Sequence, residues 1–268
     1  MMKKAIFFDL DDTLLNDRKS IQTAFDITCG ELASANGLNA KAIEESVREK
    51  ARNLYQTFPF YDFTLQIGIN PFEGLWGDFG DPHHFKFREM GERISEYQLE
   101  TWRQGLEPFG LNEEVALEAK ERFREARRSS PFVYGETFAV LDALKREDFH
   151  LLLLTNGAPS LQLEKLTLTP ELVPYFDHIV ISGNIGYGKP DSFIFRHALH
   201  VMGVNTSEAV MVGDNLSTDI LGATRIGMDS IWIDHGDGKV VEEAKPTYTV
   251  QRLKDILSFT NQWKTVLK

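Results

Sequence analysis

The sequence has little cysteine, no long apolar run and fewer basic than acidic residues, and each of these features excludes a class of protein. Its one cysteine, Cys29, excludes an internal disulfide and favours a reducing compartment, and its helical surroundings predict a small buried apolar residue rather than a nucleophile. No apolar stretch is long enough for a transmembrane helix, and the run before Asp9 is too short for a signal peptide. We therefore expect a cytoplasmic protein.

The balance of charge is acidic. The 40 Asp and Glu residues outnumber the 29 Lys and Arg residues, which gives a net charge of −11. Nucleic acids and anionic membranes attract proteins mainly through clustered basic side chains, so the sequence predicts neither as a partner. A small anionic ligand would need a local cationic site. With 268 residues, 42% of them hydrophobic, the chain can fill one large core or two modest ones, and we expect a globular monomer or homodimer.

The most informative stretch is near the start, at residues 5–15. Residues 5–8 are apolar and too few for a helix, which predicts a buried parallel strand. Asp9, Asp11 and Asp12 follow at once. Carboxylates this close repel one another unless a cation neutralises them, and Mg²⁺ prefers oxygen ligands. The stretch therefore predicts a magnesium site.

A helical pattern then continues for more than a hundred residues. It predicts helices at residues 20–35, from 39 or 40 to about 54, 84–105 and 112–128. Between them, at residues 57–82, proline and glycine interrupt a group of aromatic residues, which predicts loops and short turns packed by large rings. We therefore predict an all-helical domain over residues 16–128, followed by a hinge at Ser129, Ser130 and Pro131.

After the hinge, apolar strands alternate with helices. The predicted strands are 150–154, 178–181, 209–212, 230–233 and an edge strand at 247–250, and the predicted helices are 138–146, 160–166, 192–202, 218–226 and 252–263. Such alternation predicts a parallel sheet covered by helices on both faces. We therefore predict an α/β fold: a doubly wound, Rossmann-like core of residues 1–15 and 129–268, with the helical domain inserted as a cap. Ligands of such sheets bind at the carboxyl ends of the strands, which Asp9, Thr155, Gly183 and Asp214 follow.

Four short motifs occur in order at these strand ends. They are Asp9-Leu10-Asp11-Asp12-Thr13-Leu14, then Thr155-Asn156, then Lys189-Pro190, and finally Gly213-Asp214-Asn215 followed by Asp219. Together they resemble the haloacid dehalogenase-like (HAD) hydrolase superfamily, over about residues 1–15 and 129–250. The insertion directly after the first motif resembles the class with a helical cap. The resemblance implies a phosphatase that acts on a small phosphorylated metabolite.

The resemblance also implies how the acidic residues divide the work. Asp9 would attack phosphorus and form an aspartyl-phosphate, while Asp11 would protonate the leaving alcohol and then activate water. Mg²⁺ would be bound by Asp214, by the Asp9 carboxylate and by the backbone carbonyl of Asp11. Asp219 would contact the metal directly or through a water molecule, but an acid near a helix N-terminus is an equal alternative.

The other motif residues would contact the phosphate. Lys189 would place its positive charge against the phosphate and Asp9. Thr155 would offer its hydroxyl and Asn156 its backbone N–H to phosphoryl oxygens. Thr13 would either donate its hydroxyl near the phosphate or hold the loop, and the sequence leaves both roles open. Asp12 is predicted to be a turn residue without a role in the reaction.

Two other activities are weighed against a phosphatase. Residues 183–189 fit the spacing of a nucleotide-binding phosphate loop, but Pro190 stands where a Ser or Thr must bind Mg²⁺, so an NTPase is not predicted. A haloacid dehalogenase is the main alternative; the enzymes of that kind that resemble this chain lack the second catalytic Asp and the metal, whereas Asp11 and Asp214 are present here. A binding module that has lost catalysis is the third possibility, and the intact motifs argue against it.

The sequence says less about the substrate. In enzymes that resemble this chain, the cap contacts the part of the substrate that does not react. We therefore expect residues 57–110 to contribute to substrate specificity. The aromatic residues there either stack on a nucleobase or form the small core of the insertion, and packing is the commoner use of such residues. Candidate contacts for an acidic group are Arg18, Lys19, Arg48, Arg52, Lys86 and Arg88. The pattern resembles phosphatases of nucleoside monophosphates, phosphosugars, phosphoglycolate and phosphoserine.

Overall fold

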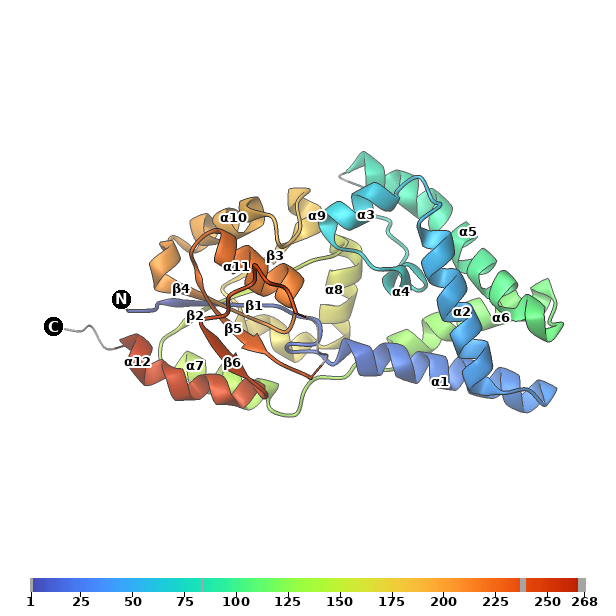
Figure 1. The fold of residues 1–268 in the computed structure, drawn as a ribbon, viewed down its shortest axis with the longest axis horizontal. Coiled ribbons are helices and arrows are strands. Elements are labelled where there is room, and N and C mark those ends of the chain that lie inside the picture. Colours follow the sequence, from blue (N-terminus) through green and yellow to red (C-terminus); the bar gives the residue numbers. More distant parts are fainter. Residues whose placement is uncertain (1, 83, 237–239, 265–268) are drawn as a thin grey trace. The chain divides into compact units, whose positions relative to one another are not determined.

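The structure, a computed structural model, describes residues 2–82, 84–236 and 240–264. The chain forms two compact units (Figure 1). The α/β unit consists of the segments 1–16, 133–157 and 169–268, and the helical unit consists of the segments 17–132 and 158–168. None of the helices in the described parts of the chain is long and apolar enough to span a membrane.

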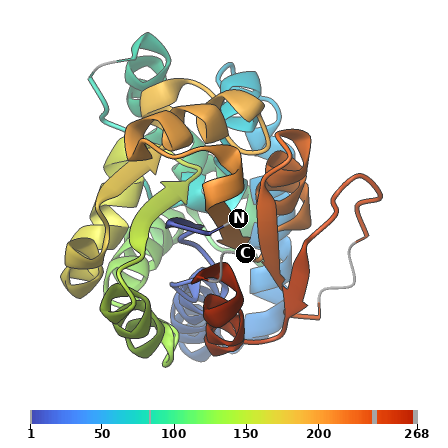
Figure 2. The same cartoon turned by 90° about the vertical axis from the view of Figure 1, so that its left-hand side faces the viewer.

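The α/β unit is built on one six-stranded sheet in the order β3-β2-β1-β4-β5-β6 (Figure 2). The strands are β1 (Ala5–Phe8), β2 (His150–Thr155), β3 (His178–Ile181), β4 (Ala209–Gly213), β5 (Asp229–Ile233) and β6 (Tyr248–Val250). Each neighbouring pair is parallel; Ala5 of β1, for example, is paired with His150 of β2 and Ala209 of β4. The predicted α/β fold and edge strand are therefore confirmed.

Helices cover both faces of this sheet, which explains the apolar strands. On one face, α10 (Ser192–Met202) and α11 (Leu221–Arg225) pack on side chains of the four strands β1 to β4. On the other lie α7 (Thr137–Arg146), the 3₁₀ helix η5 (Leu253–Phe259) and α12 (Thr260–Lys264) (Figure 1). All four residues of β1 are fully buried. Because the strands are parallel, the residues that follow β1, β2 and β4 meet at one edge.

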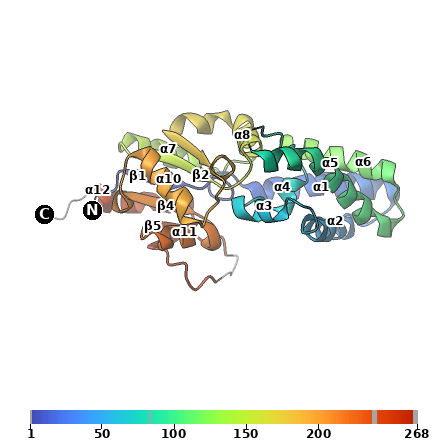
Figure 3. The same ribbon diagram turned by 90° about the horizontal axis from the view of Figure 1, so that it is seen from above.

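The helical unit is organised by four long helices, α1 (Asp17–Asn36), α2 (Ala40–Tyr55), α5 (Phe85–Leu106) and α6 (Glu113–Arg128). Helix α1 packs against α2 and α6, and α5 also packs against α2 and α6 (Figure 3). Three shorter helices complete the unit: α3 (Tyr61–Ile67), α4 (Pro71–Gly74) and α8 (Pro159–Leu168). The stretch predicted to form loops and short turns thus contains two short helices. Asn70 starts the second of them through a reciprocal capping contact with Glu73.

Aromatic rings fill the core of the helical unit. The rings of Phe25 and Phe123 have centroids 4.7 Å apart, and those of Trp102 and Phe123 are 5.8 Å apart. Phe60, Trp76 and Phe79 are at most 1% exposed, so these aromatic residues of the 57–82 stretch pack the core. Cys29 is buried in the same core, and burial raises the pKa of its thiol to about 12. This agrees with its predicted role as an apolar residue.

Some helix boundaries differ from the prediction. Helix α1 begins at Asp17 rather than Ser20, because an acidic residue in the first turn interacts favourably with the helix dipole and Ser20 is buried. The helix predicted at residues 218–226 begins as a π-type turn, η4 (Leu216–Ile220), before α11. The predicted closing helix consists of η5 and α12, so it starts as a 3₁₀ helix.

Candidate active site

The centre of the candidate site is the ion pair of Asp9 and Lys189. Asp9 follows β1 directly and is 8% exposed. The Nζ atom of Lys189 donates to Asp9 Oδ1 at 2.5 Å and to the carbonyl of Leu154 at 2.8 Å, and it lies 2.7 Å from Asp219 Oδ1. One ammonium group therefore contacts residues near or beyond the carboxyl ends of three neighbouring strands, β1, β2 and β4.

Burial and charge set the protonation of this group. Burial raises the pKa of Asp9 to about 6, and the nearby Asp219 carboxylate adds to that rise, while Lys189 opposes it. For Lys189, burial alone lowers the pKa, but the carboxylates of Asp219 and Asp9 outweigh burial and hold the pKa above its ordinary value. Lys189 is therefore a permanent cation at neutral pH, and the negative charge of Asp9 depends on it.

The loop after β1 is held by its own backbone. The amide of Asp9 donates to Val212 of β4 at 3.0 Å, and the amides of Leu14 and Leu15 both donate to Leu10. The hydroxyl of Thr13 is buried and donates weakly to Asp9 Oδ2, at 3.4 Å. The turn thus keeps Asp9 and Thr13 together. Thr13 contacts the carboxylate in this state, which is compatible with either of its two predicted roles.

The residues after β2 meet the loop that carries Lys189. The side chain of Asn156 accepts a hydrogen bond from the Lys189 backbone N–H at 2.7 Å and donates one to the Lys189 carbonyl at 2.9 Å. The side chain of Asn156 therefore positions Lys189, a role that the sequence analysis did not assign to it. Thr155 is 1% exposed, and its hydroxyl donates to the carbonyl of Asn156 at 3.3 Å.

Asp214 and Asp219 complete an acidic cluster with Asp9. Each of the three residues offers a carboxylate oxygen, and these oxygens all lie within 4.8 Å of one another. Asp219 is fully buried, and its Oδ2 accepts a hydrogen bond from the backbone N–H of Asn215 at 3.1 Å. Carboxylate oxygens this close together are suitable ligands for Mg²⁺, so the residues fit that ion. Asp11 is half-buried on the loop after β1.

The other residues considered from the sequence lie in different settings. Gly183 belongs to the short helix α9 (Ser182–Ile185), and its amide donates to Gly157 at 3.1 Å, so it does not form part of a phosphate loop. Among the cations of the helical unit, Arg48 lies 4.1 Å above the ring of Phe25 and pairs with Glu44 at 2.7 Å. Those contacts show that Arg48 packs within its own unit.

Two residues near this edge of the sheet were missed from the sequence. The indole N–H of Trp232, on β5, donates to the carbonyl of Asp214 at 2.8 Å. His235 lies just after β5, and its Nε2 is 2.8 Å from the carbonyl of Asp12. The end of β5 lies at the same edge of the sheet as the motifs, which the sequence could have indicated. Only the tertiary structure shows which side chains reach the neighbouring loops.

Comparison with known proteins agrees with this arrangement. A family model described as haloacid dehalogenase-like hydrolase matches residues 3–227. The chain belongs to the haloacid dehalogenase-like hydrolases. The match covers the strands β1 to β4 and all four motifs, so the resemblance identified in the sequence is confirmed.

Curated relatives of this hydrolase are named phosphatases. It is 35% identical over 253 residues to the phosphoserine phosphatase of Thermus thermophilus, covering 94% of this chain and 97% of the relative. It is 31% identical over 237 residues to the glyceraldehyde 3-phosphate phosphatase of Pyrococcus abyssi, covering 88% and 83%. A magnesium-bound crystal structure of the hydrolase YfnB from Bacillus subtilis aligns over 97% of this chain and 100% of that chain, with a TM-score of 0.66 and 19% identity. This last likeness concerns the fold alone.

Proposed function

We propose that this hydrolase is a Mg²⁺-dependent phosphatase that releases inorganic phosphate from a small phosphorylated metabolite through an aspartyl-phosphate at Asp9. The observation that carries the proposal is the buried Asp9 carboxylate, 2.5 Å from the ammonium group of Lys189 and beside the carboxylates of Asp214 and Asp219. The phosphatase names of the curated relatives support the reaction class.

In the proposed reaction, Asp9 and Asp11 act in turn. A carboxylate oxygen of Asp9 attacks phosphorus, the bond from phosphorus to the leaving oxygen breaks, and Asp11 gives its proton to the departing alkoxide. Asp11 then takes a proton from water as the water oxygen attacks phosphorus. The bond between phosphorus and Asp9 breaks, and inorganic phosphate leaves. Both carboxylates return to their starting protonation.

The remaining residues stabilise and position the reacting groups. Lys189 remains charged and stabilises the negative charge on the transferred phosphoryl group. The hydroxyls of Thr13 and Thr155 and the backbone N–H of Asn156 contact phosphoryl oxygens. The side chain of Asn156 also acts indirectly, because it holds the backbone of Lys189.

The acidic cluster would hold the cofactor. Asp9, Asp214 and the backbone carbonyl of Asp11 are the proposed ligands, and Asp219 contacts the ion directly or through water. A bound Mg²⁺ supplies positive charge that offsets the charges of the carboxylates and the phosphate. Without that charge, the cluster would repel an anionic substrate.

Release of inorganic phosphate from a panel of phosphomonoesters tests the proposal. The panel contains phosphoserine, glyceraldehyde 3-phosphate, phosphoglycolate, sugar phosphates and nucleoside monophosphates, each with Mg²⁺ and with EDTA. We expect turnover of at least one compound with Mg²⁺ only. We also expect Asp9→Asn to reduce turnover more than about a thousandfold, as loss of a catalytic nucleophile does in other hydrolases. Asp148→Asn is the matched control, because Asp148 is exposed and lies beyond α7.

Four results would contradict the proposal. Activity in EDTA would show that the reaction does not need Mg²⁺, and full activity of Asp9→Asn would show that Asp9 is not the nucleophile. Release of halide from 2-haloacids, without phosphatase activity, would show that the chain is a haloacid dehalogenase instead. Binding of phosphorylated compounds without turnover of any would indicate a binding module.

A further inference from the structure

We propose that Trp232 and His235, at the carboxyl end of β5, are positioning residues that hold the backbones of the two loops carrying the acidic residues. The inference rests on the proposed function, because it assigns those loops to the reaction. Neither residue belongs to the four motifs. Both lie in the α/β unit, as do both loops.

Trp232 restrains the loop after β4. In the parallel pairing of β4 and β5, Trp232 is the register partner of Gly213, the residue before Asp214. Its Nε1–H donates to the carbonyl of Asp214 at 2.8 Å. The hydrogen bond fixes the orientation of the peptide that follows Asp214, and with it the direction in which the Asp214 side chain leaves the backbone.

His235 restrains the loop after β1. Its Nε2 is 2.8 Å from the carbonyl of Asp12, and a carbonyl only accepts hydrogen bonds, so Nε2 carries the hydrogen. Asp12 has a left-handed backbone with φ of 60°, a conformation that persists only where its surroundings enforce it. The His235 contact therefore stabilises the turn that separates Asp11 from Thr13.

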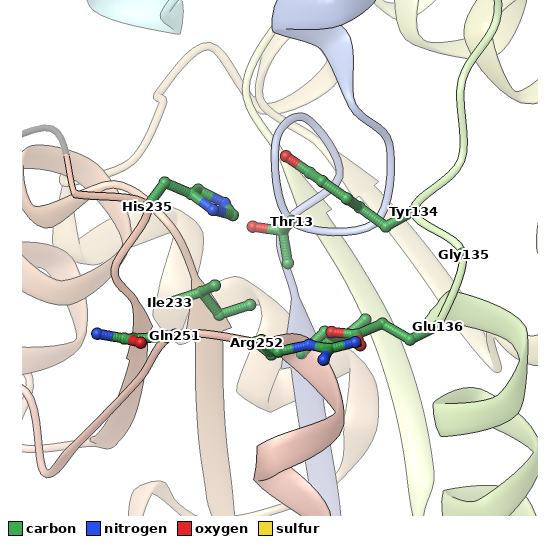
Figure 4. A pocket seen from close by; sticks show the side chains of 9 residues that line it. Thr13, Tyr134, Gly135, Glu136, Ile233, His235, Gln251 and Arg252 are labelled. Atoms are coloured by element: carbon green, nitrogen blue, oxygen red, sulfur yellow. The ribbon is translucent and has the colours of Figure 1, made fainter.

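Tyr134 completes the support of this loop. Its ring stacks on that of His235, with centroids 5.7 Å apart and planes at 15°, and its amide donates to the carbonyl of Leu14 at 3.1 Å. Figure 4 shows the side chains of His235 and Tyr134 beside the loop that carries Thr13. The loop is thus held at two backbone carbonyls, that of Asp12 by His235 and that of Leu14 by the amide of Tyr134.

The surroundings of His235 argue against a role in packing alone. His235 is exposed and lines a cavity of about 380 Å³ together with Thr13, Tyr134, Glu136 and Arg252 (Figure 4). A residue at the border of a cavity contributes little to the core. Replacing it should therefore leave the fold intact and remove mainly its hydrogen bond to Asp12.

Magnesium binding and kinetics test the two residues separately. For Trp232→Phe, which removes only the indole N–H and one ring, we expect calorimetry to show Mg²⁺ affinity reduced roughly 10- to 100-fold, as when groups supporting a metal ligand are removed. Trp102→Phe is the matched control. Trp102 is buried and its Nε1 has no hydrogen-bond partner within the described residues, so its Mg²⁺ affinity should equal that of the unmodified chain.

For His235, we compare Leu with Gln, using p-nitrophenyl phosphate as the substrate. His235→Leu should lower kcat about tenfold with little change in KM, the effect of one lost hydrogen bond of ordinary strength. His235→Gln, which keeps a donor near the position of Nε2, should recover most of that loss. His200→Gln, on the exposed side of α10, controls for the substitution itself.

Hydrogen–deuterium exchange separates this inference from the proposed function. We expect faster exchange in peptides covering residues 10–15 for His235→Leu and in peptides covering residues 213–218 for Trp232→Phe. Both changes are expected whether or not the chain hydrolyses phosphomonoesters. Unchanged exchange in both loops would overturn the positioning roles even in an active enzyme. If Trp232→Phe binds Mg²⁺ as tightly as Trp102→Phe does, the role of Trp232 is overturned. If His235→Leu and His235→Gln have equal kcat, the role of His235 is overturned. A different outcome is that the unmodified chain neither binds Mg²⁺ nor hydrolyses phosphomonoesters while the variants still show faster hydrogen–deuterium exchange in these loops. That combination would contradict only the proposed function.

Discussion

At the scale of single residues, Asp12 illustrates how a carboxylate in a motif can serve the backbone. Its φ of 60° lies in the left-handed region, which Asp and Asn tolerate better than other residues with a Cβ atom. Its carbonyl faces His235. Asp12 therefore lies in a turn, as the sequence predicted. Its left-handed backbone conformation explains why a short polar side chain is suited to this position.

The backbone conformation of Asp12 leads to a prediction. We expect Asp12→Asn to keep most of the activity, because Asn adopts the same conformation. Asp12→Val should lower kcat and the melting temperature, since a β-branched residue in this conformation costs about 1–2 kcal/mol or more. Phosphate release and thermal unfolding of both variants provide the measurement. A severe loss of activity in Asp12→Asn with unchanged melting temperature would show that the carboxylate itself takes part in the reaction.

Gly213 is confined by Asp219. A Cβ atom at residue 213 would lie 2.3 Å from Asp219 Oδ2 and 2.6 Å from Asp219 Cβ. We expect Gly213→Ala to displace Asp219 and to destabilise the chain by about 1–3 kcal/mol, the usual range for overpacking. Gly30→Ala, in α1, has nothing within 4 Å of the added atom and should instead stabilise by about 0.5–1 kcal/mol. Urea unfolding compares the two variants, and equal stability would contradict this prediction.

At the scale of elements, α8 shows what a sequence pattern leaves open. The helix was predicted at residues 160–166, directly after β2, and as part of the α/β core. In the structure its contacts group it with the helical unit. Asp81 accepts hydrogen bonds from the backbone N–H of Ser160 at 2.7 Å and from its hydroxyl at 2.6 Å. The domain boundary predicted from the sequence, 16–128 for the cap, stays a prediction.

A buried ion pair also joins α8 to α4. Lys165 Nζ lies 3.0 Å from Glu73 Oε1, and the two side chains are 5% and 4% exposed. Lys165→Met should destabilise the chain by about 3–5 kcal/mol, because it leaves the Glu73 charge buried without its cation. The exposed pair of Lys41 and Glu45 is the control, and Lys41→Met should change stability by less than about 0.5 kcal/mol.

Urea unfolding of these two variants and of the double variant Glu73→Gln/Lys165→Met gives the test. The double variant should recover part of the loss, since it removes the unpaired buried charge. A loss as small as that of Lys41→Met would mean that the pair does not stabilise the junction of α8 and α4.

At the scale of the whole molecule, acid stability depends on a buried pair between α1 and α6. Arg127 donates to Asp17 at 2.7 Å, and both side chains are buried. Burial by itself raises the pKa of Asp17, but the charges of Lys165 and Arg127 outweigh burial and hold the pKa below its ordinary value of 3.8. Because the folded pKa is below the unfolded one, ionised Asp17 stabilises the folded chain above about pH 4, and that stabilisation is lost as the pH falls through the folded pKa.

The comparison of the unmodified chain with Asp17→Asn tests this pH dependence. At pH 7 we expect the variant to be less stable by about 3–5 kcal/mol, the loss when one partner of a buried pair is removed. The difference should begin to shrink as the pH falls below about 4, where the carboxyl of the unfolded chain takes up a proton, and should shrink further as the pH falls through the lower pKa of Asp17 in the folded chain. Urea unfolding at pH 7, 5, 3.5 and 2.5 measures this difference. A difference that stays constant over this range would contradict the sign of the pKa shift.

The α/β fold and the helical insertion follow from the sequence alone, and the sequence also singles out Asp9, Lys189 and Asp214 as candidate site residues. These features are local: apolar runs of strand length, helical periodicity, and polar residues directly after strands. Parallel pairing then requires the strand ends to lie at one edge. The tertiary structure alone decided which side chains meet across that edge: Asn156 with the Lys189 backbone, Trp232 with Asp214, and His235 with Asp12. Such contacts join residues far apart in the chain, and their distances depend on strand register and side-chain direction, which no local pattern encodes.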